Sequence, residues 1–162
     1  MGVVTASGAS SEVTIASARP VQLIGTGDSN ADRRDELFIS TGNTSADEVG
    51  TLHQFATLVD CKLTLVRNAE GKPYEFRVGG NERMGAGFGC VDTDGNGSLT
   101  LVGTEYTSSD GQTFSWTRTE VMVAGGSARN AAVARGTYRA GVDDERIALL
   151  RSASCGEKRF TG

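Results

Sequence analysis

The amino-acid sequence predicts an all-β fold in a single domain, and three observations carry this expectation. A chain of 162 residues is near the usual size of one domain. It holds 22 glycines against 2 prolines, which favours many tight turns. Its hydrophobic residues gather in short runs rich in β-branched and aromatic side chains, as they do in strands. Residues 1–162 are therefore expected to form one β-sheet domain.

The first half of the chain predicts a series of strands. Residues 1–10 carry no periodic pattern and are expected to be a disordered start. Short strands are expected at residues 13–15 and 21–24. Four longer strand-like runs then cover residues 36–40, 53–59, 62–66 and 74–78, several of them with alternating hydrophobic and polar side chains.

The second half predicts long strands joined by tight turns. Residues 99–106 and 113–123 flank Asp110-Gly111, a pair that tolerates the positive φ angles of a hairpin turn. Gly125-Gly126 marks a further turn. The stretch after Asp143-Asp144 is open to two interpretations, a short helix capped by this pair and carrying Ile147, Leu149 and Leu150, or a buried strand, and we favour the strand.

An internal repeat organises these elements. Residues 28–38 can be laid over residues 92–102, an offset of 92 − 28 = 64, and the same offset places Tyr74 on Tyr138. We therefore expect repeat 1 at residues 23–86 and repeat 2 at residues 87–141, with a repeat length of about 64 residues and four strands in each. Residues 142–162 would be a truncated third repeat or a closing strand.

Each repeat begins with a loop whose oxygen-bearing side chains alternate along the chain. Calcium takes six to eight oxygen ligands, which a short loop supplies from positions 1, 3 and 5, a carbonyl at position 7 and a later carboxylate. In the first loop these positions hold Asp28, Asn30, Asp32, the carbonyl of Arg34, and Glu36 at position 9. In the second they hold Asp92, Asp94, Asn96, the carbonyl of Ser98, and Thr100.

These ten residues are the predicted metal ligands, and calcium is the expected cofactor. The loops are not EF-hands, because position 12 is Ile39 in one and Gly103 in the other, where an EF-hand needs an acid. The alternative interpretation is that both loops are simple turns, since Asp, Asn and Gly also favour turns. The second loop is expected to bind more weakly, because Thr100 replaces a closing carboxylate.

The pattern D-x-[DN]-x-[DN]-x-x-x-[DE] leading into a hydrophobic strand resembles the FG-GAP/VCBS-type repeats, whose calcium loops are like those of integrin propellers. Asp28 to Phe38 matches the pattern, and the resemblance covers about residues 23–141. It implies propeller-blade-like repeats of four antiparallel strands with structural calcium. Two copies and a fraction fall short of the roughly four blades of a propeller. The expected architecture is therefore a partial propeller, a sandwich or a barrel.

The three cysteines match no zinc or redox pattern and predict one disulfide and one free thiol. Cys90 and Cys155 fall at equivalent places of successive copies, which a ring of blades would separate. We therefore favour a Cys61–Cys90 disulfide, with Cys90–Cys155 as the alternative.

Charge and composition exclude some classes of partner. A formal charge of −4 with no concentrated basic face gives no sign of nucleic-acid binding. No apolar run is long enough for a membrane span. His53 is the single histidine and lies in a predicted strand with no catalytic motif, so we expect a surface or packed side chain. Phe76, Phe114 and Trp116 are expected in the core rather than on a glycan-stacking platform.

The sequence thus predicts a calcium-binding protein of the secreted or cell-envelope class, with its signal peptide absent from this chain. Its expected role is a binding, adhesion or structural module for an unknown protein or glycan ligand, and oligomer formation is left open. No catalytic constellation is found. The alternative is a carboxylate-dependent hydrolase or an accessory domain of a secreted enzyme, in which acid pairs such as Asp143-Asp144 or Asp47-Glu48 would act.

Overall fold

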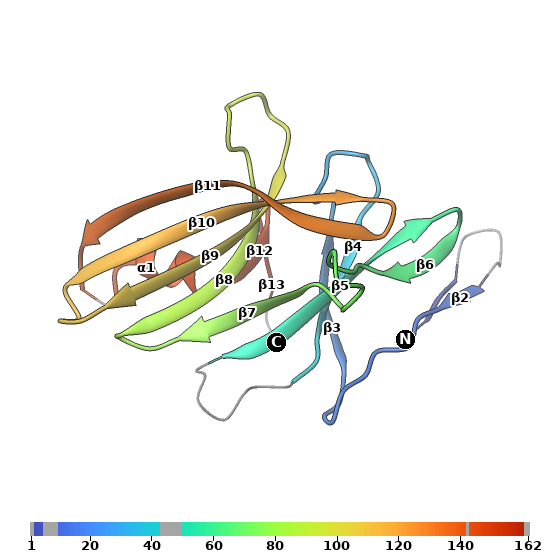
Figure 1. The fold of residues 1–162 in the computed structure, drawn as a ribbon, viewed down its shortest axis with the longest axis horizontal. Helices are drawn as coiled ribbons and strands as arrows, with labels where there is room; N and C mark the ends of the chain where they lie inside the picture. Colours follow the sequence, from blue (N-terminus) through green and yellow to red (C-terminus); the bar gives the residue numbers. More distant parts are fainter. Residues whose placement is uncertain (1, 5–9, 43–49, 142, 161–162) are drawn as a thin grey trace.

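A computed structural model describes residues 2–4, 10–42, 50–141 and 143–160, and it is all-β as predicted, with 58% strand and 4% helix. One large sheet holds eleven strands, eight of them in the order β11-β10-β9-β8-β7-β5-β4-β3 (Figure 1). The elements are β1 (Gly2–Val4), β2 (Ser10–Glu12), β3 (Gln22–Gly27), β4 (Glu36–Ser40), β5 (Thr51–Val59), β6 (Lys62–Leu65), β7 (Glu75–Gly80), β8 (Met84–Val91), β9 (Thr100–Ser108), β10 (Thr113–Ala124), β11 (Ser127–Arg139), α1 (Glu145–Leu150), β12 (Ala153–Cys155) and β13 (Lys158–Phe160).

The predicted strands of the first repeat correspond to β4, β5, β6 and β7. A two-residue turn joins β5 to β6, and both of its residues, Asp60 and Cys61, have positive φ, as a tight hairpin requires. One edge of β5 pairs with β4. Its other edge is divided between β7, which pairs with residues 51–54, and β6, which pairs with residues 56–59.

The predicted second repeat, residues 87–141, covers most of β8 and all of β9 to β11, which form a meander of long antiparallel strands. The predicted turns at Asp110-Gly111 and Gly125-Gly126 join β9 to β10 and β10 to β11. The sequence analysis did not predict strand β8, in which Gly85, Gly87 and Gly89 alternate with larger residues. Strand β8 nevertheless pairs with β9 along its whole length, from residue 84 to residue 91.

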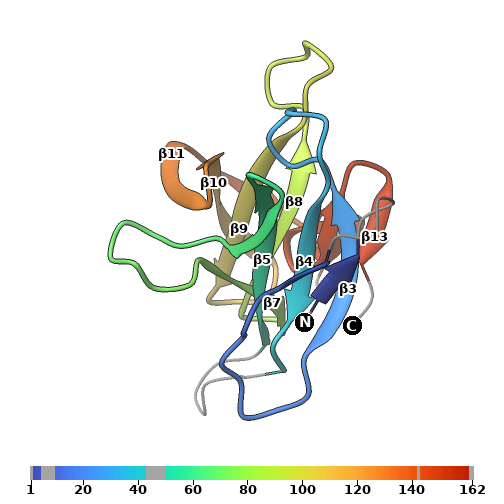
Figure 2. The ribbon, with the colours of Figure 1, turned by 90° about the vertical axis from the view of Figure 1, so that its right-hand side faces the viewer.

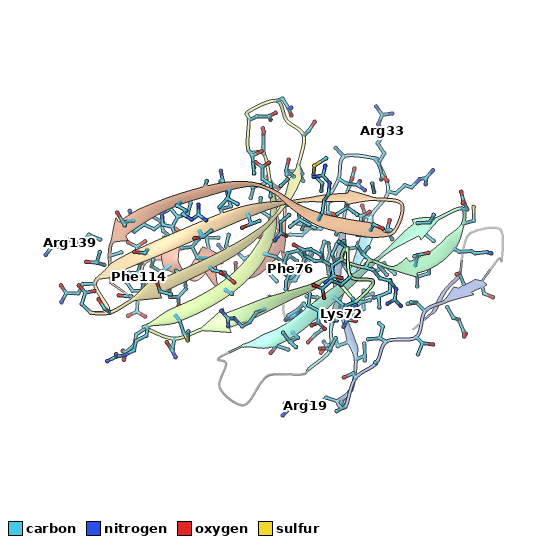
Figure 3. The ribbon with its side chains drawn as sticks, viewed as in Figure 1. Arg19, Arg33, Lys72, Phe76, Phe114 and Arg139 are labelled. Atoms are coloured by element: carbon cyan, nitrogen blue, oxygen red, sulfur yellow. A yellow bond between two sulfur atoms is a disulfide. The ribbon has the colours of Figure 1, made fainter. Side chains whose placement is uncertain are left out.

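The sheet curls without closing, which is consistent with a sandwich or a partial propeller. Its largest core is rich in phenylalanine, and a separate cluster joins Tyr106 and Phe114 to Ile147 of α1. The tip of the β10–β11 hairpin folds back toward the first repeat, where Arg67 N–H bonds to Gly126 O and Ala128 N–H bonds to Arg67 O. Phe38, Phe55, Phe76 and Phe88 belong to one buried cluster, and Figure 3 labels Phe76 among them. Residues of both predicted repeats therefore share one core.

The C-terminal segment corrects our preference for a strand, because residues 145–150 form the helix α1. The Asp144 side chain accepts a hydrogen bond from Arg146 N, which caps the first turn, and Ile147 is fully buried. The chain then forms β12, which pairs in parallel with β8, and β13. No helix in the described ranges has the length and apolar character needed to cross a membrane.

The N-terminal segment differs from the expected disordered start where it is described. Residues 2–4 form β1, which pairs with residues 10–12 in β2, while residues 1 and 5–9 lie outside the described residues. Residues 13–15 were expected to form a strand and do not, but Val13 and Ile15 still pack against Ile39 and Leu63 in a second, smaller core on the other face of the sheet.

Candidate calcium-binding loops

The two predicted loops project from the same end of the sheet and lie side by side (Figures 1 and 2). The first, residues 28–35, joins β3 to β4, and the second, residues 92–99, joins β8 to β9. A main-chain hydrogen bond from Leu101 N to Ser29 O, 3.1 Å long, connects the first loop to the strand that follows the second. The loops are therefore fixed to each other at their bases.

In the first loop, side-chain oxygens at positions 1, 3 and 5 accept hydrogen bonds from the loop's own main chain. Asp28 Oδ2 accepts from Arg33 N at 2.9 Å, and Asp28 Oδ1 accepts from Asp32 N at 3.2 Å. Asn30 Oδ1 also accepts from Asp32 N, at 3.0 Å, and Asp32 Oδ1 accepts from Arg34 N at 2.9 Å. The main chain thus wraps around the three side chains.

The second loop shares the bonds from positions 6 and 7, whereas Asp92 Oδ1 accepts from position 4 and Asp28 Oδ1 from position 5. Asp92 Oδ1 accepts from Gly95 N at 2.7 Å, and Asp92 Oδ2 accepts from Gly97 N at 2.9 Å. Asn96 Oδ1 accepts from Ser98 N at 2.7 Å, as Asp32 does from Arg34. The Gly97 and Gly95 N–H groups hold the pKa of the Asp92 carboxyl below its usual value.

The backbone turns in the same way in both loops. Positions 4 and 6 have positive φ in each, 59° at Ala31 and 65° at Arg33 in the first loop, and 75° at Gly95 and 84° at Gly97 in the second. Glycine adopts this conformation freely, whereas a residue with a side chain pays about 1–2 kcal/mol for it. The first loop therefore keeps its shape at an energetic cost that the second avoids.

The donor sets of the two loops have the same composition in a different order. Each holds two carboxylates and one amide, with the amide at position 3 in the first loop and at position 5 in the second. The amide nitrogen bonds to a neighbouring carboxylate in both, Asn30 to Asp32 at 3.4 Å and Asn96 to Asp94 at 2.8 Å. Among the described residues, no three His, Cys, Asp or Glu side chains come together as a metal-holding group.

The residues at position 9, Glu36 in the first loop and Thr100 in the second, differ in chemistry and in burial. Glu36 is fully buried, because the alternation of β4 puts it on the same face as the core residue Phe38. Its carboxylate accepts hydrogen bonds from Ser29 N, Ser29 Oγ and Thr57 Oγ1 at 2.8, 2.6 and 3.1 Å. Burial raises the Glu36 pKa, which these hydrogen bonds partly offset. Thr100 is the half-buried first residue of β9.

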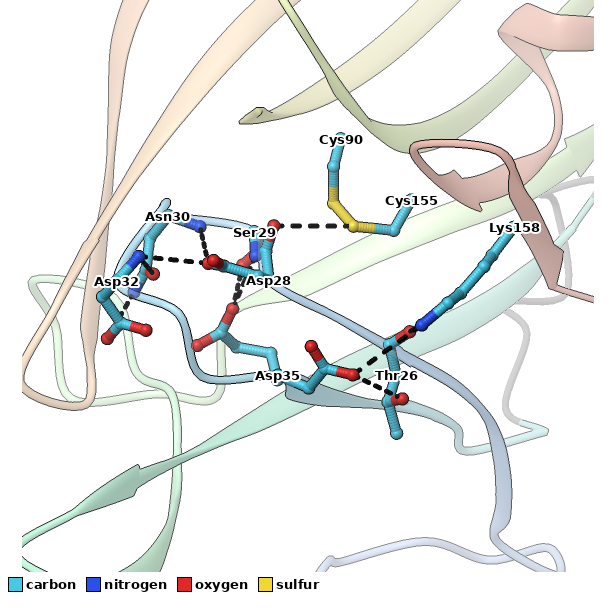
Figure 4. The surroundings of a disulfide bond; sticks show 10 residues. Thr26, Asp28, Ser29, Asn30, Asp32, Asp35, Cys90, Cys155 and Lys158 are labelled. Atoms are coloured by element: carbon cyan, nitrogen blue, oxygen red, sulfur yellow. Dashed lines mark hydrogen bonds and ion pairs between the residues drawn. A yellow bond between two sulfur atoms is a disulfide. The ribbon is translucent and has the colours of Figure 1, made fainter. Parts of the chain in front are cut away.

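The disulfide corrects the predicted pairing. Cys90 is bonded to Cys155, with 4.3 Å between the Cα atoms, and Cys61 is free and exposed in the β5–β6 turn. The prediction assumed that successive copies stand apart, but the parallel pairing of β12 with β8 brings these two cysteines together. Cys155 Sγ lies 3.9 Å from the Asp28 carbonyl oxygen, so the disulfide sits directly beneath the first loop (Figure 4).

The other candidates identified in the sequence occupy structural positions. His53 is 5% exposed and packs near the Phe88 ring, and burial lowers its pKa to about 4. Phe76 and Phe114 are buried, and Trp116 is half-buried and stacks on Tyr138.

The acid pairs form no catalytic arrangement in the described residues. Asp144 caps α1 and forms an ion pair with Arg146, and Asp143 is exposed. Asp47 and Glu48 lie outside the described residues. Comparisons of the chain with family models, with curated proteins and with solved structures found no match.

Proposed function

We propose that the two loops bind Ca²⁺ and that the protein is a calcium-stabilised β-protein acting as a binding, adhesion or structural module. The observation that carries this proposal is the common geometry of two loops 64 positions apart, with oxygen side chains at positions 1, 3 and 5 in both. Simple turns would not need to share three side-chain positions and two positive-φ positions. Hard oxygen donors on a wrapping main chain are the ligands that Ca²⁺ prefers.

In this proposal Asp28, Asn30 and Asp32 hold one ion with the Arg34 carbonyl, and Asp92, Asp94 and Asn96 hold the other with the Ser98 carbonyl. Positions 1, 3 and 5 of each loop offer only two carboxylates. Because Glu36 is turned into the core and position 100 is a threonine, neither loop presents an exposed acid at position 9. We therefore expect weak sites with water completing the shell, in the range of about 10⁻⁴–10⁻³ M that extracellular calcium modules show.

A secreted or envelope location suits these features. The Cys90–Cys155 disulfide is of a kind that persists in oxidising compartments, where calcium is also plentiful. The alternative of a carboxylate-dependent hydrolase draws no support from the described residues, because the carboxyl group with the raised pKa, Glu36, is enclosed by Ser29 and Thr57.

The test is thermal unfolding in excess EDTA, in millimolar calcium and in millimolar magnesium. Millimolar calcium is about 1–10 times the expected Kd, which stabilises the folded state by about 0.4–1.4 kcal/mol per site. In a chain of this size, about 1 kcal/mol raises Tm by roughly 2–4 °C. We expect a rise of several degrees that is specific to calcium. The rise should disappear in the double variant Asp28→Ala, Asp92→Ala.

The matched control is Asp110→Ala. Asp110 also accepts main-chain hydrogen bonds in a turn, from Gln112 N and Thr113 N, but it is not followed by Asp or Asn at positions 3 and 5, which are Gln112 and Phe114. This variant should lose stability equally with and without calcium. A melting temperature that calcium does not change in the wild type would reduce both loops to turns and remove the proposal.

A further inference from the structure

The two terminal strands of the main sheet differ in what lies beside them. At one end, β13 lies next to β3: the Phe160 ring packs on the face of β3 where a Cβ of Gly25 would point, and Lys158 Nζ bonds to the main-chain oxygen of Thr26. At the other end, β11 pairs only with β10 over residues 133–139, and no other described main chain hydrogen-bonds to this stretch. Such an open edge is a template for another strand.

The register shows which main-chain groups of β11 point outward. Ala140 N bonds to Gln112 O, which makes Ala140 and Gln112 a hydrogen-bonded pair of the antiparallel ladder. Such pairs occur at every second position, so Tyr138 with Phe114 and Gly136 with Trp116 are hydrogen-bonded pairs as well. Gly136 and Tyr138 therefore bond to β10. The alternate residues of β11 have main-chain N–H and C=O groups that point away from β10, and these residues are Val133, Arg135, Thr137 and Arg139.

The side chains of these same four residues lie on one face of the strand and are exposed. Arg135 and Arg139 form no ion pair or hydrogen bond with any described residue, and Figure 3 shows Arg139 directed away from the molecule. Strand β11 contains no acidic residue. On this face of β10 the partners are Thr113, Ser115, Thr117 and Thr119, so the edge is basic in a protein of net charge −4.

We propose that the outer edge of β11 binds an extended acidic peptide segment of a partner protein as an added β-strand. Main-chain hydrogen bonds from Val133, Arg135, Thr137 and Arg139 would supply the pairing, and acids at alternate positions would meet the two arginines. A second copy of this chain fits less well, because its β11 edge would place two more arginines beside Arg135 and Arg139. The acid on this face, Glu105, lies two strands in from the edge, opposite Thr117. The proposal is independent of calcium, because the edge exists whether or not the loops hold metal.

The sharpest test removes one outward N–H group. Thr137→Pro deletes it without breaking a β10–β11 hydrogen bond, since proline is accepted at strand edges whose N–H faces solvent. Thr137→Ala is the matched control, which keeps the N–H. The probe is a synthetic peptide that alternates glutamate with valine and threonine, measured by fluorescence anisotropy beside a counterpart with lysine for glutamate.

We expect the wild type and Thr137→Ala to bind the glutamate peptide more tightly than the lysine peptide, and Thr137→Pro to bind it at least about tenfold more weakly, as the loss of a net hydrogen bond of about 1.4 kcal/mol requires. Equal binding by the proline and alanine variants would overturn the proposal. The double variant Arg135→Glu, Arg139→Glu should reverse the preference to the lysine peptide, which keeps the test decisive if the proline variant does not fold.

Two further readouts separate the remaining outcomes. Sedimentation measures self-association, and a dimer that Thr137→Pro dissolves would overturn the acidic partner in favour of a second copy. Peptide binding is measured in calcium and in EDTA. Equal peptide affinity in calcium and in EDTA supports an edge site that works whether or not the loops bind calcium.

Discussion

Glu36 connects the first loop to the core at the scale of a single residue. Its carboxylate is buried but not bare, since Ser29 donates two hydrogen bonds to one oxygen and Thr57 donates one to the other. Ser29 is in turn bonded through its carbonyl to Leu101 in β9. Glu36 therefore holds the base of the first loop in place, whatever binds above it.

Replacing Glu36 by alanine should destabilise the protein by about 3 kcal/mol or more, because it leaves buried donors of Ser29 and Thr57 without acceptors. Urea unfolding in EDTA measures this cost. Thr57→Val removes a single donor and should cost about 1 kcal/mol. A loss of stability seen only in calcium-containing buffer would contradict the anchoring role and identify Glu36 as a metal ligand.

Asp110 gives a prediction on pH. The N–H groups of Thr113 and Gln112 lower its pKa from 3.8 to about 2, so the ionised form is favoured by folding. Its contribution to stability is complete above 3.8 and is lost as the pH falls through about 2. In urea unfolding, Asp110→Asn should be less stable than the wild type at neutral pH and equal to it near pH 2. A difference that stays constant with pH would contradict the cause assigned to the shift.

At the scale of elements, the glycine face of β8 is where α1 and β12 approach the sheet. A Cβ on Gly87 would lie 2.3 Å from Ser152 O and 2.9 Å from Leu150 O, both main-chain atoms. A Cβ on Gly89 would come closest to the Ser154 side chain, at 3.2 Å, and would meet Ser154 O and the Val91 side chain only at an ordinary contact distance of 3.8 Å. The glycines therefore let one backbone pack directly against another.

Gly87→Ala should cost about 1–3 kcal/mol, the range of overpacked sites, because the main chain after α1 must move away from β8. Gly89→Ala should cost less, since a serine side chain can rotate. Denaturant unfolding of the two variants compares them. Equal costs would show that the segment after α1 adapts freely.

The glycine face of β8 shows why some elements could be predicted from the sequence and others could not. Runs such as residues 53–59 and 113–123 carry their own strand signal in β-branched and aromatic residues. Strand β8 does not, because its glycines are selected by what packs on them. The same holds for the disulfide, which depends on where β12 docks, and for Ser29, whose role depends on the burial of Glu36. Helix α1 had a cap signal in Asp144, but its apolar residues also suited a strand.

At the scale of the whole molecule, the two predicted repeats form one body. Phe38 and Phe55 come from the first, Phe88 and Leu101 from the second, and all four belong to one core. The tip of the β10–β11 hairpin adds Val121 and Ala128 to this core. Neither repeat buries its hydrophobic face alone.

Unfolding should therefore be a single transition. Trp116 is the one tryptophan and packs against Tyr138 in the second repeat, whereas far-ultraviolet circular dichroism averages over every strand. We expect the two signals to change at the same denaturant concentration. A fluorescence transition that precedes or follows the dichroism transition would mean that the repeats unfold separately.

The covalent link between Cys90 and Cys155 has a consequence for the chain as a connected object. The bond spans 65 positions, and the second loop, the long hairpins and α1 all lie between its ends. That part of the protein is a closed ring, with residues before Cys90 and after Cys155 as two tails. A protease that cuts the exposed second loop opens the ring without releasing a fragment, so the cleaved protein remains one molecule until the disulfide is reduced.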